Sequence, residues 1–194
     1  LQQIRQIPGV TGVISTLYDA PGDVWELDAI LALKKEIEDA GLSLAGIESV
    51  NVHDAIKAGL PDRDKYIDNY IATLENLGKA DIHLVCYNFM PVFDWTRTEL
   101  ARLRPDGSTV LAYTQEAVDN LNPEEMFSSI SSDTNGSIMP GWEPERMEHI
   151  KELFEMYRNV DDEALFANLT YFLERIMPVC DKHDINMAIH PDDP

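Results

Sequence analysis

The sequence predicts an α/β fold built on a parallel sheet, and two observations support this prediction. Four short runs of apolar and β-branched residues recur along the chain, and segments with helical periodicity lie between them. Continuous apolar runs are typical of strands that are buried on both faces, as in a parallel sheet. Strand and helix alternate in units of about 30 to 40 residues, which is βαβ organisation with right-handed crossovers expected.

The predicted strands are residues 11–16, 44–50, 82–89 and 185–190. In α/β folds of this kind, ligands bind at the carboxyl ends of the strands. Functional residues are therefore expected in the segments 48–54, 87–97 and 190–193.

The first two predicted helices have sequence signals at their ends. In the first, apolar residues recur at steps of three and four over residues 27–40, Asp23 and Glu26 have the spacing of a capping box, and Gly41 follows as the C′ residue. The second covers residues 62–77, and Gly78 is expected to end it.

The third predicted helix begins at Asp161 and carries an apolar stripe as far as Cys180. Pro178 lies within its last turns, where proline removes a backbone donor, and a kink is expected there.

An insertion interrupts the repeat at about residues 90–160. The turn Pro105-Asp-Gly107 predicts a hairpin, a Ser- and Asn-rich stretch covers residues 128–137, and a further helix is expected over residues 144–157. A long, elaborated βα loop more often covers an active site than links two domains. We therefore expect residues 1–194 to form a segment of a single domain.

Composition narrows the classes of function. The chain has 194 residues, 35 Asp plus Glu against 15 Lys plus Arg, a formal net charge of −20 and a hydrophobic fraction of 44%. The apolar content is enough for a packed core, whereas the negative surface argues against nucleic acid and anionic membranes as partners. No apolar run approaches the roughly 20 residues of a membrane-spanning helix. Two distant cysteines indicate neither a disulfide framework nor a zinc site, so a reducing cytoplasm is expected.

His190 is the first candidate metal ligand. Pro191 favours an extended backbone at His190, and Asp192 and Asp193 follow directly. Imidazole and carboxylate donors without a thiolate cluster suit Mn²⁺, Fe²⁺ or Zn²⁺. The alternative is a loop histidine beside an aspartate that caps a turn.

A second candidate cluster follows the third strand. Tyr87, Asn88, Trp95 and Arg97 combine hydrogen-bonding and aromatic groups with one cation, which suits a polyhydroxylated ligand that carries a carboxylate. Arg97 is notable because an anionic substrate needs local compensation in so acidic a chain. In the alternative, the aromatic residues of this segment pack under the long loop.

The remaining polar and thiol side chains are ambiguous or structural. Glu48 ends the second apolar run, where a carboxylate needs a partner, either in a functional site or in a strand-end hydrogen bond. His53 is expected on the surface or behind the site. We predict structural roles for the other histidines and the two cysteines: His83, His149, His183, Cys86 and Cys180.

Several of these segments together resemble the mannonate dehydratase family, in order and over nearly the whole chain. The most specific are the segment from Val85-Cys-Tyr-Asn-Phe to Asp94-Trp-Thr-Arg-Thr98 and Met187-Ala-Ile-His-Pro-Asp-Asp-Pro194. The others are Thr11 to Thr16 with Pro21-Gly-Asp-Val-Trp25, Gly46 to Lys57, Asp68-Asn-Tyr70 with Thr73 to Gly78, and Pro140-Gly-Trp-Glu143.

The resemblance implies a metal-dependent (β/α)8 TIM barrel of the xylose-isomerase-like kind. Such a barrel needs about 250 residues, and only about four βα units, the second to the fifth, are expected here. The resemblance implies that His190 binds Mn²⁺ or Fe²⁺ and that Tyr87, Asn88 and Arg97 line the substrate pocket. It places the catalytic proton-transfer groups and the other metal ligands in the missing C-terminal half, so none is assigned here.

The implied function is that of a hydro-lyase in hexuronate (glucuronate) catabolism. It converts D-mannonate to 2-keto-3-deoxy-D-gluconate and water by metal-assisted removal of the C2 proton and the C3 hydroxyl. A cytoplasmic homo-oligomer, a dimer, is expected, and the segment alone is expected to be inactive. Two alternatives remain: a sugar isomerase or epimerase on the same barrel, and a non-catalytic acidic module that binds cations.

Overall fold

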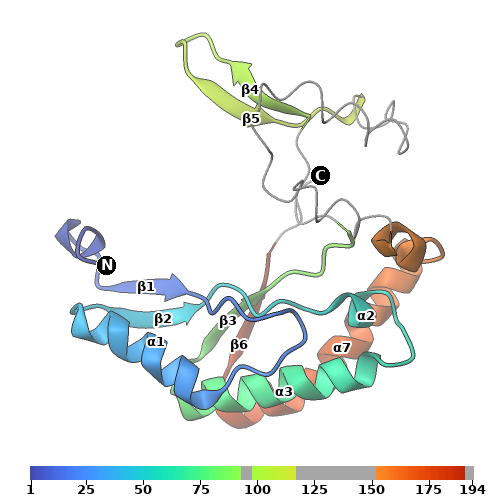
Figure 1. Ribbon diagram of the computed structural model, residues 1–194, viewed down its shortest axis with the longest axis horizontal. Helices are drawn as coiled ribbons and strands as arrows, with labels where there is room; N and C mark the ends of the chain where they lie inside the picture. Colours follow the sequence, from blue (N-terminus) through green and yellow to red (C-terminus); the bar gives the residue numbers. More distant parts are fainter. Residues whose placement is uncertain (93–97, 117–151, 191–194) are drawn as a thin grey trace. The chain divides into compact units, whose positions relative to one another are not determined.

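The computed structural model describes residues 1–92, 98–116 and 152–190, which fall into two compact units. The first unit comprises residues 1–91 and 160–191, and the second comprises residues 92–159 and 192–194. The parallel sheet and its helices belong to the first unit, and a hairpin belongs to the second (Figure 1).

The sheet of the first unit has four parallel strands in the order β1-β2-β3-β6. They are β1 (Gly12–Ser15), β2 (Ser43–Ile47), β3 (Leu84–Tyr87) and β6 (Asn186–Ile189). All four predicted strands are confirmed, and each ends before the predicted run ends. Glu48, Asn88 and His190 therefore follow the strands, at the edge where the chain leaves the sheet.

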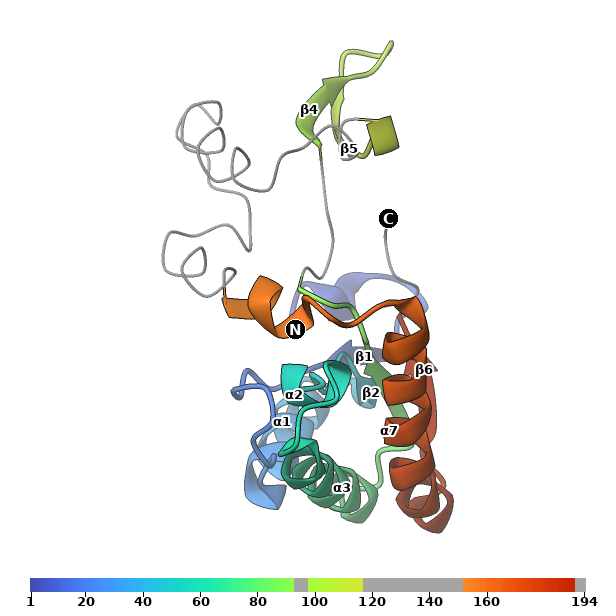
Figure 2. The same ribbon diagram turned by 90° about the vertical axis from the view of Figure 1, so that its right-hand side faces the viewer.

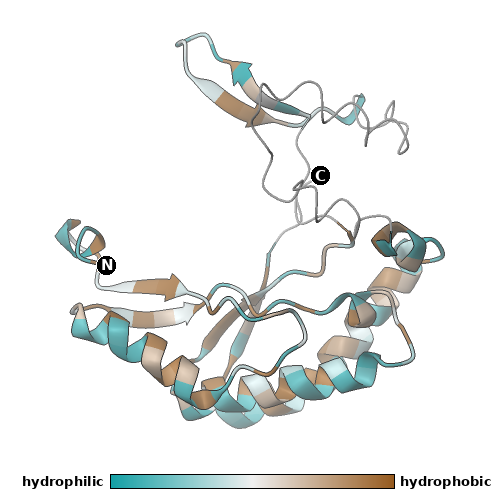
Figure 3. Ribbon diagram, viewed as in Figure 1, coloured by the Kyte–Doolittle hydropathy of each residue, from teal (hydrophilic) through white to brown (hydrophobic). Residues whose placement is uncertain are grey.

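Three helices lie on one face of this sheet: α1 (Leu27–Asp39), α3 (Arg63–Lys79) and α7 (Asp162–His183), as Figures 1 and 2 show. Hydrophobic and hydrophilic residues alternate along α1 and α3, while β1 is mostly apolar (Figure 3). The helices and strands bury their apolar residues in one shared core, whose fully buried members include Ile30, Ile47, Leu74, Val85 and Phe172. This burial is the main driving force for docking the helices on the sheet.

The ends of α1 differ in part from the prediction. Gly41 follows the helix with φ of 75°, which confirms its C′ role. The predicted capping box is wrong, because the helix begins at Leu27 and its N-cap, Glu26, makes no side-chain capping hydrogen bond. Asp23 instead lies in the preceding turn, where its N–H donates to Ala20 O at 3.1 Å.

Gly78 does not end α3, which continues to Lys79. A Cβ atom on Gly78 would lie 2.4 Å from Cγ of His183, on α7. The residue is therefore glycine because the two helices approach closely there, and the prediction of a helix stop at this position is wrong.

Helix α7 begins as predicted, since the Asp161 side chain accepts a hydrogen bond from Ala164 N–H at 2.8 Å. The helix is assigned without a break through Pro178 to His183, and Asp184 ends it in the left-handed region.

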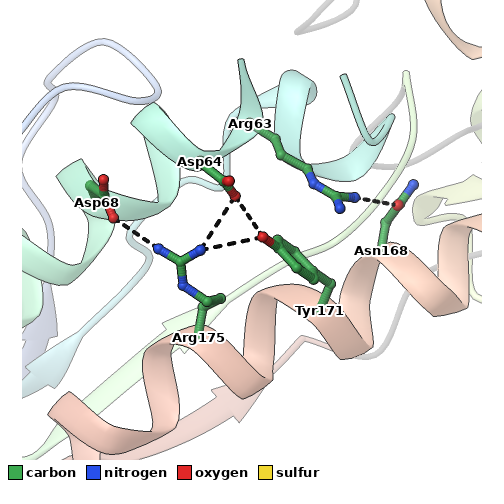
Figure 4. A network of polar contacts seen from close by, with 6 residues as sticks. All are labelled: Arg63, Asp64, Asp68, Asn168, Tyr171 and Arg175. Carbon is green, nitrogen blue, oxygen red and sulfur yellow. Dashed lines mark hydrogen bonds and ion pairs between the residues drawn. The ribbon is translucent and has the colours of Figure 1, made fainter. Parts of the chain in front are cut away.

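A polar network joins the exposed sides of α3 and α7 (Figure 4). The Tyr171 hydroxyl donates to Asp64 at 2.8 Å, and the Arg175 guanidinium pairs with Asp68 at 3.1 Å. Nearby, Arg63 donates to the Asn168 side chain at 3.2 Å and lies 3.8 Å from the centre of the Tyr171 ring. The network fixes the register of the two helices outside their apolar contact.

Two shorter helices complete the first unit, a 3-10 turn η1 (Ile4–Gln6) and α2 (Asp54–Lys57). Sequence patterning predicted neither, because each is too short for periodicity to show.

The second unit contains the predicted hairpin, formed by the antiparallel strands β4 (Glu99–Leu103) and β5 (Thr109–Ala112). Gly107 adopts φ of 83° in its turn, which explains the glycine there. Residues 152–157 are helical, in agreement with the end of the predicted helix. The earlier part of that helix and the Ser- and Asn-rich stretch lie outside the described residues.

Candidate functional site at the carboxyl edge of the sheet

The segments that follow β2, β3 and β6 meet at the carboxyl edge of the sheet, because the strands are parallel. Backbone hydrogen bonds extend the ladders past the strand ends. Glu48 N–H donates to Ser15 O at 2.9 Å, and His190 N–H donates to Tyr87 O at 2.8 Å. The backbones that carry Glu48 and His190 are thus held by the sheet, which limits where their side chains can go.

The side chains of Glu48 and His190 are in contact. Oε1 of Glu48 lies 2.6 Å from Nε2 of His190, and the two side chains are 45% and 47% exposed. An imidazole and a carboxylate that remain half exposed at the carboxyl edge of an α/β sheet are accessible to a ligand.

Cys86, in β3, is a third member of this group. Burial is the main cause that raises the pKa of its thiol, and the negative charge of Glu48 and a hydrogen bond with that carboxylate raise it further. The thiol is therefore neutral at physiological pH and can donate to Glu48. This contact goes beyond the core role that the sequence predicted for Cys86.

Two further side chains order the loops at this edge. His53 is the N-cap of α2, where its Nδ1 accepts from Ala55 N–H at 3.0 Å, and its ring stacks on Tyr66 at a centroid distance of 3.6 Å. Burial lowers the pKa of His53. Lys57 is 7% exposed, and its ammonium donates to Met90 O at 3.0 Å and lies 3.3 Å from an Asp54 oxygen.

The predicted substrate-binding residues differ in burial and in whether the structure describes them. Asn88 is partly buried directly after β3. Tyr87 is buried, and its ring lies 6.1 Å from that of Phe172 on α7. Arg97 and Trp95 lie outside the described residues, as do Asp192 and Asp193. The assignment of Tyr87, Asn88 and Arg97 to a substrate pocket stays a prediction.

The described histidines outside this edge have structural contacts. His83 binds Asp81 at 2.9 Å, and its other ring nitrogen contacts the Asp184 carbonyl at 3.0 Å. His183 packs against Gly78. His149 lies outside the described residues.

The imidazole nitrogen of His190 fits a divalent ion such as Mn²⁺ or Fe²⁺. Within residues 1–92, 98–116 and 152–190, no group of three or more His, Cys, Asp or Glu side chains is arranged to hold a metal ion. The described residues thus offer part of a coordination sphere, with His190 as the predicted ligand.

Sequence reasoning missed the pairing of Glu48 with His190 and the capping role of His53. The one available signal was a carboxylate at the end of an apolar run, which pointed to Glu48 but not to its partner. His53 gave no signal, because histidine is not a favoured N-cap residue.

The helices in the described part of the chain include none that is both long and apolar enough to cross a membrane.

The model of the D-mannonate dehydratase (UxuA) family matches residues 1–194. A mannonate dehydratase from Brachyspira hyodysenteriae is 65% identical over the whole chain, and one from Thermotoga petrophila is 54% identical. The chain covers 55% and 54% of these two proteins, so it spans about half the length of the curated relatives it matches.

The solved structures agree with the sequence comparison. The crystal structure of mannonate dehydratase from Streptococcus suis serotype 2 is similar over 100% of this chain and 50% of its own, with a TM-score of 0.82 and 42% identity. This similarity confirms the predicted α/β fold class, with the four parallel strands and their helices corresponding to about half of that structure. From the family match along its whole length and these identities, the chain belongs to the mannonate dehydratase family.

Proposed function

We propose that the protein to which this chain belongs dehydrates D-mannonate to 2-keto-3-deoxy-D-gluconate and water. The observation that carries the proposal is the match of the D-mannonate dehydratase family model to all 194 residues. The reaction breaks the C2–H and C3–O bonds, the hydroxyl leaves as water, and the resulting enol becomes the 2-keto group.

In this proposal His190 binds a divalent ion, Mn²⁺ or Fe²⁺. When bound, such an ion supplies Lewis-acid stabilisation of the negative charge that develops as the proton leaves C2. The imidazole of His190 is half exposed, and its backbone N–H is bonded to Tyr87 O, so the chain presents one donor in a restrained position.

Asn88 and Arg97 are proposed to bind the hydroxyls and the carboxylate of the sugar acid, and Tyr87 is proposed to line the same pocket. Lys57 supports this arrangement, because its hydrogen bond to Met90 O holds the segment between Asn88 and Arg97 at its start. We also propose that the protein acts in glucuronate catabolism, that it is located in the cytoplasm and that it forms a homodimer.

The full-length protein with Mn²⁺ or Fe²⁺ should convert D-mannonate to a product that has lost one water, identified by mass spectrometry and by NMR of its C3 methylene group. A product of unchanged mass would instead indicate the isomerase or epimerase alternative. A lack of any turnover with either metal would contradict the proposed function.

The variant His190→Ala distinguishes the proposed function from the non-catalytic alternative, an acidic module that binds cations. Our proposal expects loss of tight Mn²⁺ binding and of activity in this variant, whereas a module that binds ions through many surface carboxylates keeps its metal stoichiometry.

We also propose that the 194-residue chain alone does not turn over D-mannonate. In the described sheet, β1 and β6 each have one neighbouring strand, and Ile14 and Ile189 on these strands are 47% and 49% exposed. Robust turnover by the purified chain would contradict this.

A further inference from the structure

Glu48 lies where three strands of the sheet end, and it receives contacts from two of them. It follows β2 directly, its charge raises the pKa of Cys86 in β3, and His190 contacts it from the end of β6. A carboxylate that connects neighbouring strands in this way is held more firmly than one in a surface ion pair.

The contact with His190 has a defined chemical consequence. The distance of 2.6 Å between Oε1 and Nε2 is short, as expected for a charge-assisted hydrogen bond. A neutral imidazole carries one N–H, and an acceptor next to Nε2 favours the tautomer in which that nitrogen is protonated. The lone pair is then on Nδ1.

We propose that Glu48 is a positioning residue that fixes the tautomer and the ring orientation of His190, so that Nδ1 is the atom presented to the divalent ion. This inference rests on the proposed function, because it takes His190 as a metal ligand. Metal-binding histidines commonly donate their second ring N–H to a carboxylate, and loss of that partner costs about 10- to 100-fold in metal affinity.

Cys86 lies close to the same carboxylate, on the partly buried face of β3. The charge of Glu48 contributes to the raised pKa of its thiol, behind the burial of that thiol. Since Glu48 N–H is also bonded to Ser15 O, both the backbone and the side chain of this residue are restrained.

Mn²⁺ alone, titrated into the full-length apoprotein and followed by calorimetry, tests the role of Glu48. Glu48→Ala should weaken Mn²⁺ binding by about 10- to 100-fold. Glu48→Gln should lose less Mn²⁺ affinity than Glu48→Ala, because the amide oxygen can still accept a hydrogen bond from Nε2–H of His190. The matched control is Glu38→Gln, which changes an exposed carboxylate at the C-terminal end of α1. This variant should bind Mn²⁺ with the affinity of the wild type.

Two outcomes of the titration overturn the inference. Unchanged affinity in Glu48→Ala removes the positioning role. Equal and large losses in Glu48→Ala and Glu48→Gln make Glu48 a direct ligand instead.

A readout without metal or substrate separates this inference from the proposed function. In ¹⁵N-histidine-labelled apoprotein, NMR should show His190 protonated at Nε2 in the wild type and in Glu48→Gln, with the tautomers mixed in Glu48→Ala. Protonation at Nδ1 in the wild type overturns the inference. If the NMR result holds but His190→Ala binds Mn²⁺ as wild type does, the metal-ligand role in the proposed function has failed, and the contact itself stands.

Discussion

The α3–α7 interface and the carboxyl edge of the sheet both contain exposed ion pairs, but they differ in what lies beneath them. At the interface, the pairs of Figure 4 border a core in which Phe172 is completely buried. At the edge, Glu48 and His190 meet with their own side chains about half exposed in the described part of the chain. The difference indicates that packing stabilises the interface, while the edge keeps its polar groups accessible to a ligand.

The largest effect should come from the core of the interface. Phe172→Ala removes a ring that contacts Tyr70 edge-on at 5.0 Å and lies 6.0 Å from Phe89. We expect a loss of about 3–5 kcal/mol in the free energy of unfolding, measured by urea denaturation. Phe166→Ala, on the same helix but 70% exposed, is the matched control and should change it by less than about 0.5 kcal/mol. Similar losses in both variants would contradict the assignment of the core.

Gly78→Ala should cause the next largest loss in the free energy of unfolding. Alanine in a helix interior normally stabilises, but here its Cβ meets the His183 ring at 2.4 Å. We expect destabilisation by about 1–3 kcal/mol, measured by thermal and urea unfolding. Addition of His183→Ala should restore part of the loss, and an unrelieved loss in the double variant would show that the helices do not touch there.

His53 should make the stability of the edge loops dependent on pH. Burial lowers its pKa below the ordinary value of 6.5, so the folded state binds this proton less readily than the unfolded state. The contribution is therefore fully present above about pH 6.5 and is lost as the pH falls from there through the lower pKa of the folded state, at which the protonated Nδ1 can no longer accept from Ala55 N–H.

His53→Asn keeps a capping acceptor that does not titrate, and unfolding curves at pH 5 and pH 7.5 should show a smaller pH dependence than in the wild type. His53→Ala should lose about 0.5–2 kcal/mol at neutral pH. The raised pKa of His83, due mainly to its hydrogen bond with Asp81, acts in the opposite direction, so the comparison is between variants. Identical pH profiles in the wild type and His53→Asn would contradict the prediction.

The exposed network between α3 and α7 should contribute less. Arg175 pairs with Asp68 and contacts Tyr171, and its side chain is 38% exposed. A double-mutant cycle of Arg175→Met and Asp68→Asn should give a coupling of about 0.2–1 kcal/mol that decreases at high salt. A salt-independent coupling would show that the pair is more buried than the structure indicates.

The smallest effect on stability should come from the edge itself. His190→Ala is expected to change the free energy of unfolding by less than about 0.5 kcal/mol, because the side chain is half exposed. Chemical denaturation of the metal-free full-length protein provides the measurement. A loss comparable to that of Phe172→Ala would mean that the edge is part of the core, and the contrast between the two regions would fail.

Local patterns were sufficient to predict the four strands, the three long helices and the hairpin, because hydrophobic periodicity and turn residues act over short stretches. They failed where the cause lies elsewhere in the chain. Gly78 has the appearance of a C-terminal cap, but its reason is His183, on another helix. Glu48 and His190 are 142 positions apart, and no periodicity links them. Each was a candidate for the site, but their contact depends on the order of the strands, which a single sequence does not reveal.

Lys57 has a consequence for engineering this scaffold. Its ammonium binds Met90 O just before the insertion, and its carbonyl oxygen accepts from the Asn168 side chain, near the start of α7, at 2.9 Å. Lys57 thus contacts the chain both before and after the insertion at about residues 90–160. Since the entropy of closing a loop grows only slowly with its length, changes in the length of the chain between Arg97 and the start of α7 should leave the underlying sheet intact.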